Sequence, residues 1–218
     1  MNSRILNIAV LFCSLIFLPI LHAQAFDVSP VVDGTVFDGK YPNLFDGQGD
    51  YINSTGYPQA MNMNGSASRA LFEFPLSSIE NSFIAASLNL TVEECLGPFP
   101  YTLGIYSYAG DGYLDFDDYA RGNIIGSITF NDQSTLNYDV TSVVHDLISS
   151  GKSYVGFNIR KEEQDILAPG QPFVAFRSLE YPPSAYLSVK ATPEPISSAL
   201  FLLGSGALAI GVRLKKKV

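Results

Sequence analysis

The chain has 218 residues, of which 47% are hydrophobic and 16% are charged, and its formal net charge is −8. This length suits one ordinary domain with additional segments. The hydrophobic content excludes an intrinsically disordered chain, and a total of two cysteines excludes a disulfide scaffold. The acidic balance predicts no nucleic-acid partner, because phosphates bind to basic surfaces.

Residues 1–25 are predicted to form a secretory signal peptide. Arg4 gives the segment a positive start, and the stretch from Ile5 to Leu21 is almost entirely apolar. Ala23 and Ala25 then supply the small residues that signal peptidase accepts at positions −3 and −1. The alternative for this segment is an uncleaved membrane anchor.

Cleavage after the second alanine leaves Phe26 as the new N-terminus of a body that we place at residues 26–190. This body contains 8 basic and 20 acidic residues, so that its net charge is about −12. Cys95 is its single cysteine, and no intramolecular disulfide can form. A domain of this charge stays soluble and repels acidic polymers unless cations bridge them.

Apolar and polar side chains alternate through nearly the whole body, which predicts β-strands. In one stretch, Phe72 and Phe74 share a face, Arg69 and Glu73 occupy the other face, and Leu71 is an apolar exception. We expect about nine to eleven short strands, separated by turns rich in glycine and proline. They are expected near residues 31–37, 50–53, 69–76, 86–92, 103–105, 124–130, 136–140, 155–159, 174–176 and 185–189.

One segment of the body is predicted to be helical. Apolar residues recur at helical spacing between Val143 and Ile148, with Thr141 expected as the N-cap and Gly151 just beyond the end. Many strands, one short helix and no alternation of strands with helices predict an all-β protein. The fold expected is an antiparallel β-sandwich of jelly-roll type in a single domain.

The order of several body segments resembles the DNRLRE-type sandwich domains of secreted bacterial proteins, which are akin to carbohydrate-binding modules. The resemblance covers roughly residues 69–189, and it departs from the family in lacking an aromatic residue late in the helix. It implies a fold and no particular activity. The segments that carry it are Arg69–Ile79, Ala85–Leu90, Asp139–Val144, Gly156–Arg160, Phe176–Glu180 and Ala185–Val189.

The residues that could support catalysis are few, so the body is predicted not to be an enzyme. His145 is the only histidine left after signal cleavage, and Cys95 has no partner cysteine at metal-binding spacing. Glu93 and Glu94 are adjacent on a strand and so point to opposite faces, which does not suit a pair of glycosidase carboxylates.

Two features of the body suggest ligands. Asp111, Asp115 and Asp118 fit part of a calcium-binding loop around a central glycine. Alternatively, Asp115, Asp117 and Asp118 could cap a short helix that reaches Arg121. Calcium is therefore one alternative, and helix capping is the other. Four closely spaced tyrosines could provide a stacking surface for sugars: Tyr101, Tyr106, Tyr108 and Tyr113.

The C-terminal segment carries the most specific signal. Residues 191–195 form a linker that contains Pro193, Glu194 and Pro195, and the seventeen residues of Ile196–Val212 carry no charge. As a helix this stretch is about 26 Å long, close to the ~30 Å of a hydrocarbon core, so it is predicted to cross the membrane. A basic tail at residues 213–218 follows and predicts a cytoplasmic end; its charged residues are Arg213, Lys215, Lys216 and Lys217.

The Pro-Glu-Pro triplet, the glycine-containing apolar helix and the basic terminus together resemble the PEP-CTERM sorting signal. This resemblance covers the last 26 residues. It implies recognition by a membrane-embedded exosortase and cleavage near the triplet. It also implies a Gram-negative-type bacterium that makes exopolysaccharide and biofilm matrix. An ordinary tail anchor is the alternative.

The sequence therefore predicts a non-enzymatic β-sandwich exported across the inner membrane, anchored there transiently, and delivered to the cell envelope or extracellular matrix. Signal peptidase and an exosortase are its expected processing partners. One alternative is a carbohydrate-binding module for exopolysaccharide. Another is a hydrolase that acts on matrix polysaccharide.

Overall fold

The computed structural model describes residues 24–39, 46–63, 66–96, 100–130, 135–161 and 173–192. The chain divides into two compact units, and residues 25–191 form the unit considered below. Within the described ranges, no helix combines the length and the apolar composition needed to cross a membrane. The predicted membrane helix at 196–212 lies outside the described residues, as do the basic tail, the Pro-Glu-Pro triplet and most of the predicted signal peptide.

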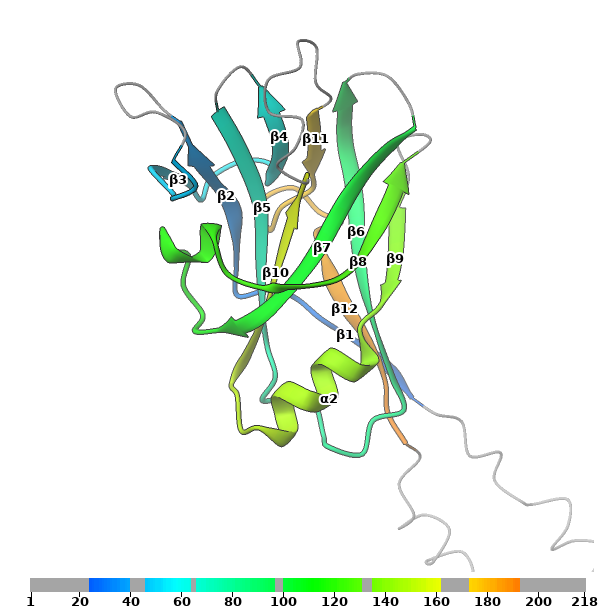
Figure 1. The fold of residues 1–218 in the computed structure, drawn as a ribbon. Helices are drawn as coiled ribbons and strands as arrows, with labels where there is room; N and C mark the ends of the chain where they lie inside the picture. The colour runs from blue at the N-terminus through cyan, green and yellow to red at the C-terminus, as the bar shows by residue number, and fades with distance from the viewer. Residues whose placement is uncertain are drawn as a thin grey trace, which may run out of the picture. The chain divides into compact units, whose positions relative to one another are not determined.

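The described residues form a 12-stranded antiparallel sheet with one α-helix, which confirms an all-β fold (Figure 1). Nine strands follow in the order β1-β12-β6-β11-β4-β5-β10-β7-β8, while β2 and β9 branch from β5 and β6, and β3 pairs with β2. The strands are β1 (Ala25–Val28), β2 (Val32–Asp38), β3 (Tyr51–Asn53), β4 (Gln59–Met63), β5 (Ser66–Pro75), β6 (Ala85–Leu96), β7 (Tyr101–Gly110), β8 (Asn123–Phe130), β9 (Thr135–Asp139), β10 (Tyr154–Arg160), β11 (Phe173–Phe176) and β12 (Tyr186–Lys190).

The sheet exceeds the nine to eleven strands expected from the sequence because β1 and β4 were not anticipated. β1 overlaps the end of the predicted signal peptide, and only four residues form it. β4 has the sequence Gln-Ala-Met-Asn-Met, in which the one buried position with a described side chain is Ala60. Ala60 lies between Gln59 and the apolar Met61, so polar and apolar residues do not alternate regularly and the pattern that marks a strand is weak there.

The sheet curls around one main hydrophobic core. Phe72 and Phe74 of β5, Phe157 of β10 and Leu88 of β6 are all fully or almost fully buried in it. Phe74 and Phe157 meet edge to face, with their ring centroids 6.0 Å apart. The alternation predicted for these strands is therefore confirmed on this inner face, where every second side chain enters the core.

The helix α2 (Thr141–Ser149) lies at one end of the curled sheet, and its buried Val144 joins the main core (Figure 1). The expected helix and its end are confirmed, since Gly151 follows it with a φ of 69°. The expected N-cap is wrong. Val140 occupies the cap position, and the Thr141 hydroxyl accepts a hydrogen bond from the N–H of Ala86 at 3.0 Å. The threonine thus attaches the helix to β6.

The first and last strands of the body are neighbours. β1 pairs antiparallel with β12, and Ala25 lies opposite Lys190 while Phe26 lies opposite Val189. The chain therefore enters and leaves the body at the same place on one sheet edge (Figure 1). Antiparallel pairing brings the beginning of one strand next to the end of the other, which produces this arrangement directly.

Candidate functional site

The predicted acidic segment covers the outer face of β5, β7 and β10. It contains a short 3-10 helix, η1 (Asp117–Tyr119), and the Tyr119 side chain is completely buried. Tyr119 packs in a second hydrophobic cluster with Leu71 of β5 and Tyr108 of β7. Leu71, the apolar exception of the sequence pattern, is thus a core residue of this outer cluster.

Glu73 of β5 lies completely buried beneath the start of this segment. Its Oε2 accepts hydrogen bonds from the backbone N–H groups of Asp111, at 3.0 Å, and Gly112, at 2.6 Å. Burial raises the pKa of Glu73, and the Gly112 N–H and the neighbouring Tyr108 hydroxyl offset part of that effect. The carboxylate lies directly over Gly110, where a Cβ would come within 2.5 Å of Oε2, so that any larger residue would displace it.

The other predicted carboxylates of the segment bind one another's backbone and Arg121. Asp118 Oδ2 accepts the N–H of Asp115 at 2.9 Å, and Asp115 Oδ1 accepts the N–H of Asp118 at 3.1 Å. Arg121 donates to the buried Asp118 Oδ1 at 2.8 Å and lies 3.8 Å from Asp115 Oδ2. Burial raises the pKa of Asp118, and the N–H of Asp115 opposes that rise.

The helix-capping alternative is met only in part: Asp115 Oδ1 accepts a backbone N–H of η1, whereas the cap position itself is occupied by Phe116, which makes no side-chain capping hydrogen bond. Among the described residues, no three or more His, Cys, Asp or Glu side chains are grouped as metal ligands. Asp111 is exposed, and its Oδ1 accepts the N–H of Tyr113 at 3.0 Å within a local turn. Calcium binding at Asp111, Asp115 and Asp118 stays one of the two alternatives, and its test is described in the Discussion.

Sequence reasoning missed the polar anchor beneath the segment. The Tyr119 carbonyl oxygen accepts hydrogen bonds from Arg69 of β5 and, at 3.1 Å, from Asn158 of β10. The Arg69 guanidinium also lies 3.7 Å from the centroid of the Tyr119 ring. Asn158 is completely buried. One signal in the sequence was Asn158, which stands between Phe157 and Ile159. Alternation alone, however, predicts that Arg69 and Asn158 face solvent.

The four tyrosines predicted as a stacking surface do not share one surface. Tyr101 belongs to the main core, whereas Tyr108 belongs to the outer cluster. Tyr106 is buried as well, with the Arg160 guanidinium 3.5 Å from its ring centroid. Only Tyr113, 75% exposed, presents its ring to solvent. These residues therefore cannot stack sugars together.

The other catalytic candidates have structural contacts. The His145 ring stacks on Phe83 at a centroid distance of 3.9 Å. Cys95 is buried, and burial raises the pKa of its thiol. Glu93 forms an ion pair with Arg177 at 2.7 Å, while Glu94 is exposed. The Glu93 carboxylate is therefore engaged by a guanidinium, and the Cys95 thiol is withdrawn from solvent.

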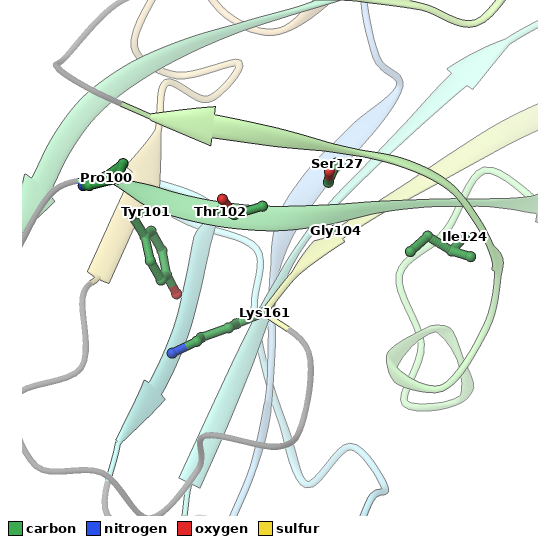
Figure 2. Close-up of a pocket in the computed structure, with 7 residues that line it drawn as sticks. All are labelled: Pro100, Tyr101, Thr102, Gly104, Ile124, Ser127 and Lys161. Atoms are coloured by element: carbon green, nitrogen blue, oxygen red, sulfur yellow. The ribbon is translucent and has the colours of Figure 1, made fainter.

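A pocket of about 350 Å³ lies between β7, β8 and the residue that follows β10, Lys161 (Figure 2). Figure 2 shows the Lys161 side chain pointing toward Tyr101, and its Nζ lies 5.6 Å from that ring's centroid. The described residues that line the pocket include no carboxylate, histidine or cysteine. The remaining lining residues are Pro100, Thr102, Gly104, Ile124 and Ser127.

A second surface feature combines aromatic rings with an ion pair, and we call it the aromatic–ionic patch. It consists of Tyr57, Glu93, Arg177 and Tyr181. The register between β6 and β11 shifts at Glu93, so this residue stands opposite no residue of β11. Such a bulge redirects a side chain away from the regular alternation.

Comparison with known proteins adds no assignment: no family model matches the chain, and no curated protein is significantly similar to it.

Proposed function

We propose that this chain is an exported, non-enzymatic protein of the cell envelope or extracellular matrix. In this proposal its body is a β-sandwich of jelly-roll type, and a PEP-CTERM tail directs its sorting by an exosortase. Signal peptidase releases the N-terminal segment. The C-terminal helix holds the protein in the inner membrane until the exosortase acts near Pro193, Glu194 and Pro195.

The observation that carries this proposal is the pairing of β1 with β12. Ala25 lies opposite Lys190, so that both segments proposed for removal join the body side by side. Attachment points at the same end of the body allow a leader and a tail to reach the same membrane. Cleavage after Ala25 also leaves the pairing of Phe26 with Val189 in place.

The contacts of the potential catalytic groups support a non-enzymatic role. His145 stacks on Phe83, and Glu93 pairs with Arg177. The curled sheet, with buried residues of β5, β6 and β10 in one core, supports a sandwich. An acidic body of about −12 remains soluble in an extracellular matrix.

The test is mass spectrometry of both termini of the protein, recovered separately from membranes and from medium of an exosortase-bearing bacterium. We expect the released form to begin at Phe26 and to lack Arg213 and the three terminal lysines. Replacing Glu194 and Pro195 by alanine should retain the protein in the membrane with its basic tail intact, because the triplet that the exosortase recognises is lost.

The matched control replaces Glu80, an exposed glutamate of the body, by alanine and should leave release unchanged. Recovery of the protein from the cytosol contradicts the proposal. So does released material that still carries Lys215, Lys216 and Lys217.

A further inference from the structure

The aromatic–ionic patch contains two tyrosines that lie far apart in the sequence. The ring centroids of Tyr57 and Tyr181 are 4.8 Å apart with an interplanar angle of 42°. Tyr181 is 49% exposed, so one part of its ring packs on Tyr57 while another part meets solvent. Tyrosine rings offer a rigid apolar surface at low conformational entropy cost.

A polar pair lies beside these rings. Arg177 Nε donates to Glu93 Oε2 at 2.7 Å, and the Tyr57 hydroxyl donates to Glu93 Oε1 at 3.4 Å. Both charged side chains remain about one-third exposed. The guanidinium has five N–H donors, and its bonds with Glu93 and the Pro182 carbonyl use only some of them.

The loop that presents Tyr181 is held in place by several hydrogen bonds. The Arg177 N–H donates to the Thr91 carbonyl oxygen at 2.9 Å, and the Arg177 side chain donates to the Pro182 carbonyl oxygen at 3.1 Å. The Leu179 N–H donates to the buried Asp33 carboxylate at 2.9 Å. A surface fixed in this way loses little entropy when a ligand binds.

We propose that the aromatic–ionic patch binds a sugar ring of an uncharged polysaccharide. The exposed part of the Tyr181 ring contacts the apolar C–H face of the sugar. Arg177 and Glu93 form hydrogen bonds with hydroxyl groups at the edge of the same sugar ring. A planar guanidinium beside a carboxylate offers neighbouring donors and acceptors, which matches the hydroxyl groups of one ring.

Size and charge select this ligand class. A stable protein interface buries about 800 Å² on each partner, which is more than four side chains provide. The body carries about −12, which repels an acidic polysaccharide at long range. An uncharged glycan needs no interface of that size and is not repelled by the negative charge of the body. This inference goes beyond the proposed function, because a matrix protein can be sorted without binding a glycan.

The experiment measures retardation of the full chain in native gels that contain soluble polysaccharide. The detergent is zwitterionic, because a detergent with a sugar headgroup would compete. The uncharged probes are dextran, laminarin, galactomannan and hydroxyethylcellulose, and alginate is the acidic probe. We expect retardation by at least one uncharged probe and none by alginate.

Variants locate the binding surface. Tyr181→Ala should weaken binding roughly tenfold, whereas Tyr181→Phe should retain it because the ring persists. Arg177→Lys should weaken binding as well, since a lysine cannot supply two fixed donors. Tyr113→Ala is the matched control, as it removes a more exposed tyrosine from a different loop. Thermal melting confirms that each variant is folded.

Three results would overturn the inference: no retardation by any uncharged probe, retardation by alginate alone, or equal losses in Tyr113→Ala and Tyr181→Ala. Loss of binding in Tyr181→Ala combined with full binding in folded Arg177→Lys would restrict the site to stacking and refute the polar contribution. Capture of a protein through Tyr181 with no glycan binding would assign the patch to another partner class. None of these outcomes affects the terminal processing measured for the proposed function.

Discussion

The two faces of β5 are both buried, yet they are buried in different ways. On the inner face, Phe72 and Phe74 enter the main core among other apolar side chains. On the outer face, Arg69 and Glu73 lie beside Leu71 under the segment that contains η1. Apolar burial needs only shape and area, whereas buried charges need specific partners.

The difference shows how one strand can satisfy two environments. The inner face is covered by other strands of the sheet, whose side chains are supplied by regular alternation. The outer face is covered by a loop, whose backbone groups bind the polar side chains of the strand, as Asp111 and Gly112 bind Glu73. The outer face therefore depends on individual hydrogen bonds more than on total apolar area.

The largest expected effect lies on the inner face. Phe72→Ala should lower the free energy of unfolding by about 3–5 kcal/mol, because it leaves a cavity where the ring meets Phe176 edge to face. Urea denaturation measures the loss. Phe116→Ala is the control, since that ring is about half exposed and its removal should cost less than ~0.5 kcal/mol. Similar losses for both would refute the assignment of the core.

The second effect concerns the polar exception on the inner face, Asp33. It lies opposite Phe72 in the β2–β5 register and is buried, and burial raises its pKa from 3.8 to about 7 despite the hydrogen bond from Leu179. As the pH rises above about 4, the unfolded chain releases this proton first. The contribution of Asp33 to stability therefore falls until about pH 7 and changes no further above it.

Asp33→Asn keeps an acceptor oxygen for the Leu179 N–H and removes the titration. We expect the variant to match the wild type near pH 4 and to be more stable by about 2–4 kcal/mol near pH 8. Denaturation at both pH values measures this difference. A variant whose stability changes between these pH values just as the wild type's does would show that Asp33 is not held as described.

The third effect tests the outer face. Glu73→Ala should lower the free energy of unfolding by about 1–3 kcal/mol, because it leaves the N–H groups of Asp111 and Gly112 without their acceptor under the loop. Glu73→Gln retains an acceptor oxygen and should cost less. Hydrogen exchange of these two amides should accelerate in the alanine variant. Equal stability of the two variants would show that the hydrogen bonds contribute little.

The inner face of the sheet could be predicted from the sequence, because the alternation of apolar and polar side chains is a direct consequence of strand geometry. The spacing of Phe72 and Phe74, and the helical spacing between Val143 and Ile148, each indicated the correct element. The cap was assigned wrongly because Thr141 also has a tertiary partner, Ala86, which no local pattern reveals.

The burial of the outer face of β5 could not be predicted, for a related reason. Arg69 and Glu73 occupy positions that alternation assigns to solvent, and only the fold brings the segment around Tyr119 over them. The aromatic–ionic patch was missed similarly, since Tyr57 and Tyr181 are 124 positions apart in the sequence. Contacts between distant segments need the complete sheet before they can be recognised.

The smallest expected effect concerns calcium at Asp111, Asp115 and Asp118. Because Arg121 already neutralises Asp118 and lies near Asp115, a cation would have to replace the guanidinium. We expect the melting temperature of the full chain to be the same in calcium and in chelator. A rise in calcium that is abolished by the double variant Asp111→Ala, Asp118→Ala would instead establish the calcium loop. Arg121→Gln sharpens the test, because it frees both carboxylates: a calcium response that arises only in this variant would show that the arginine occupies the position a cation would take.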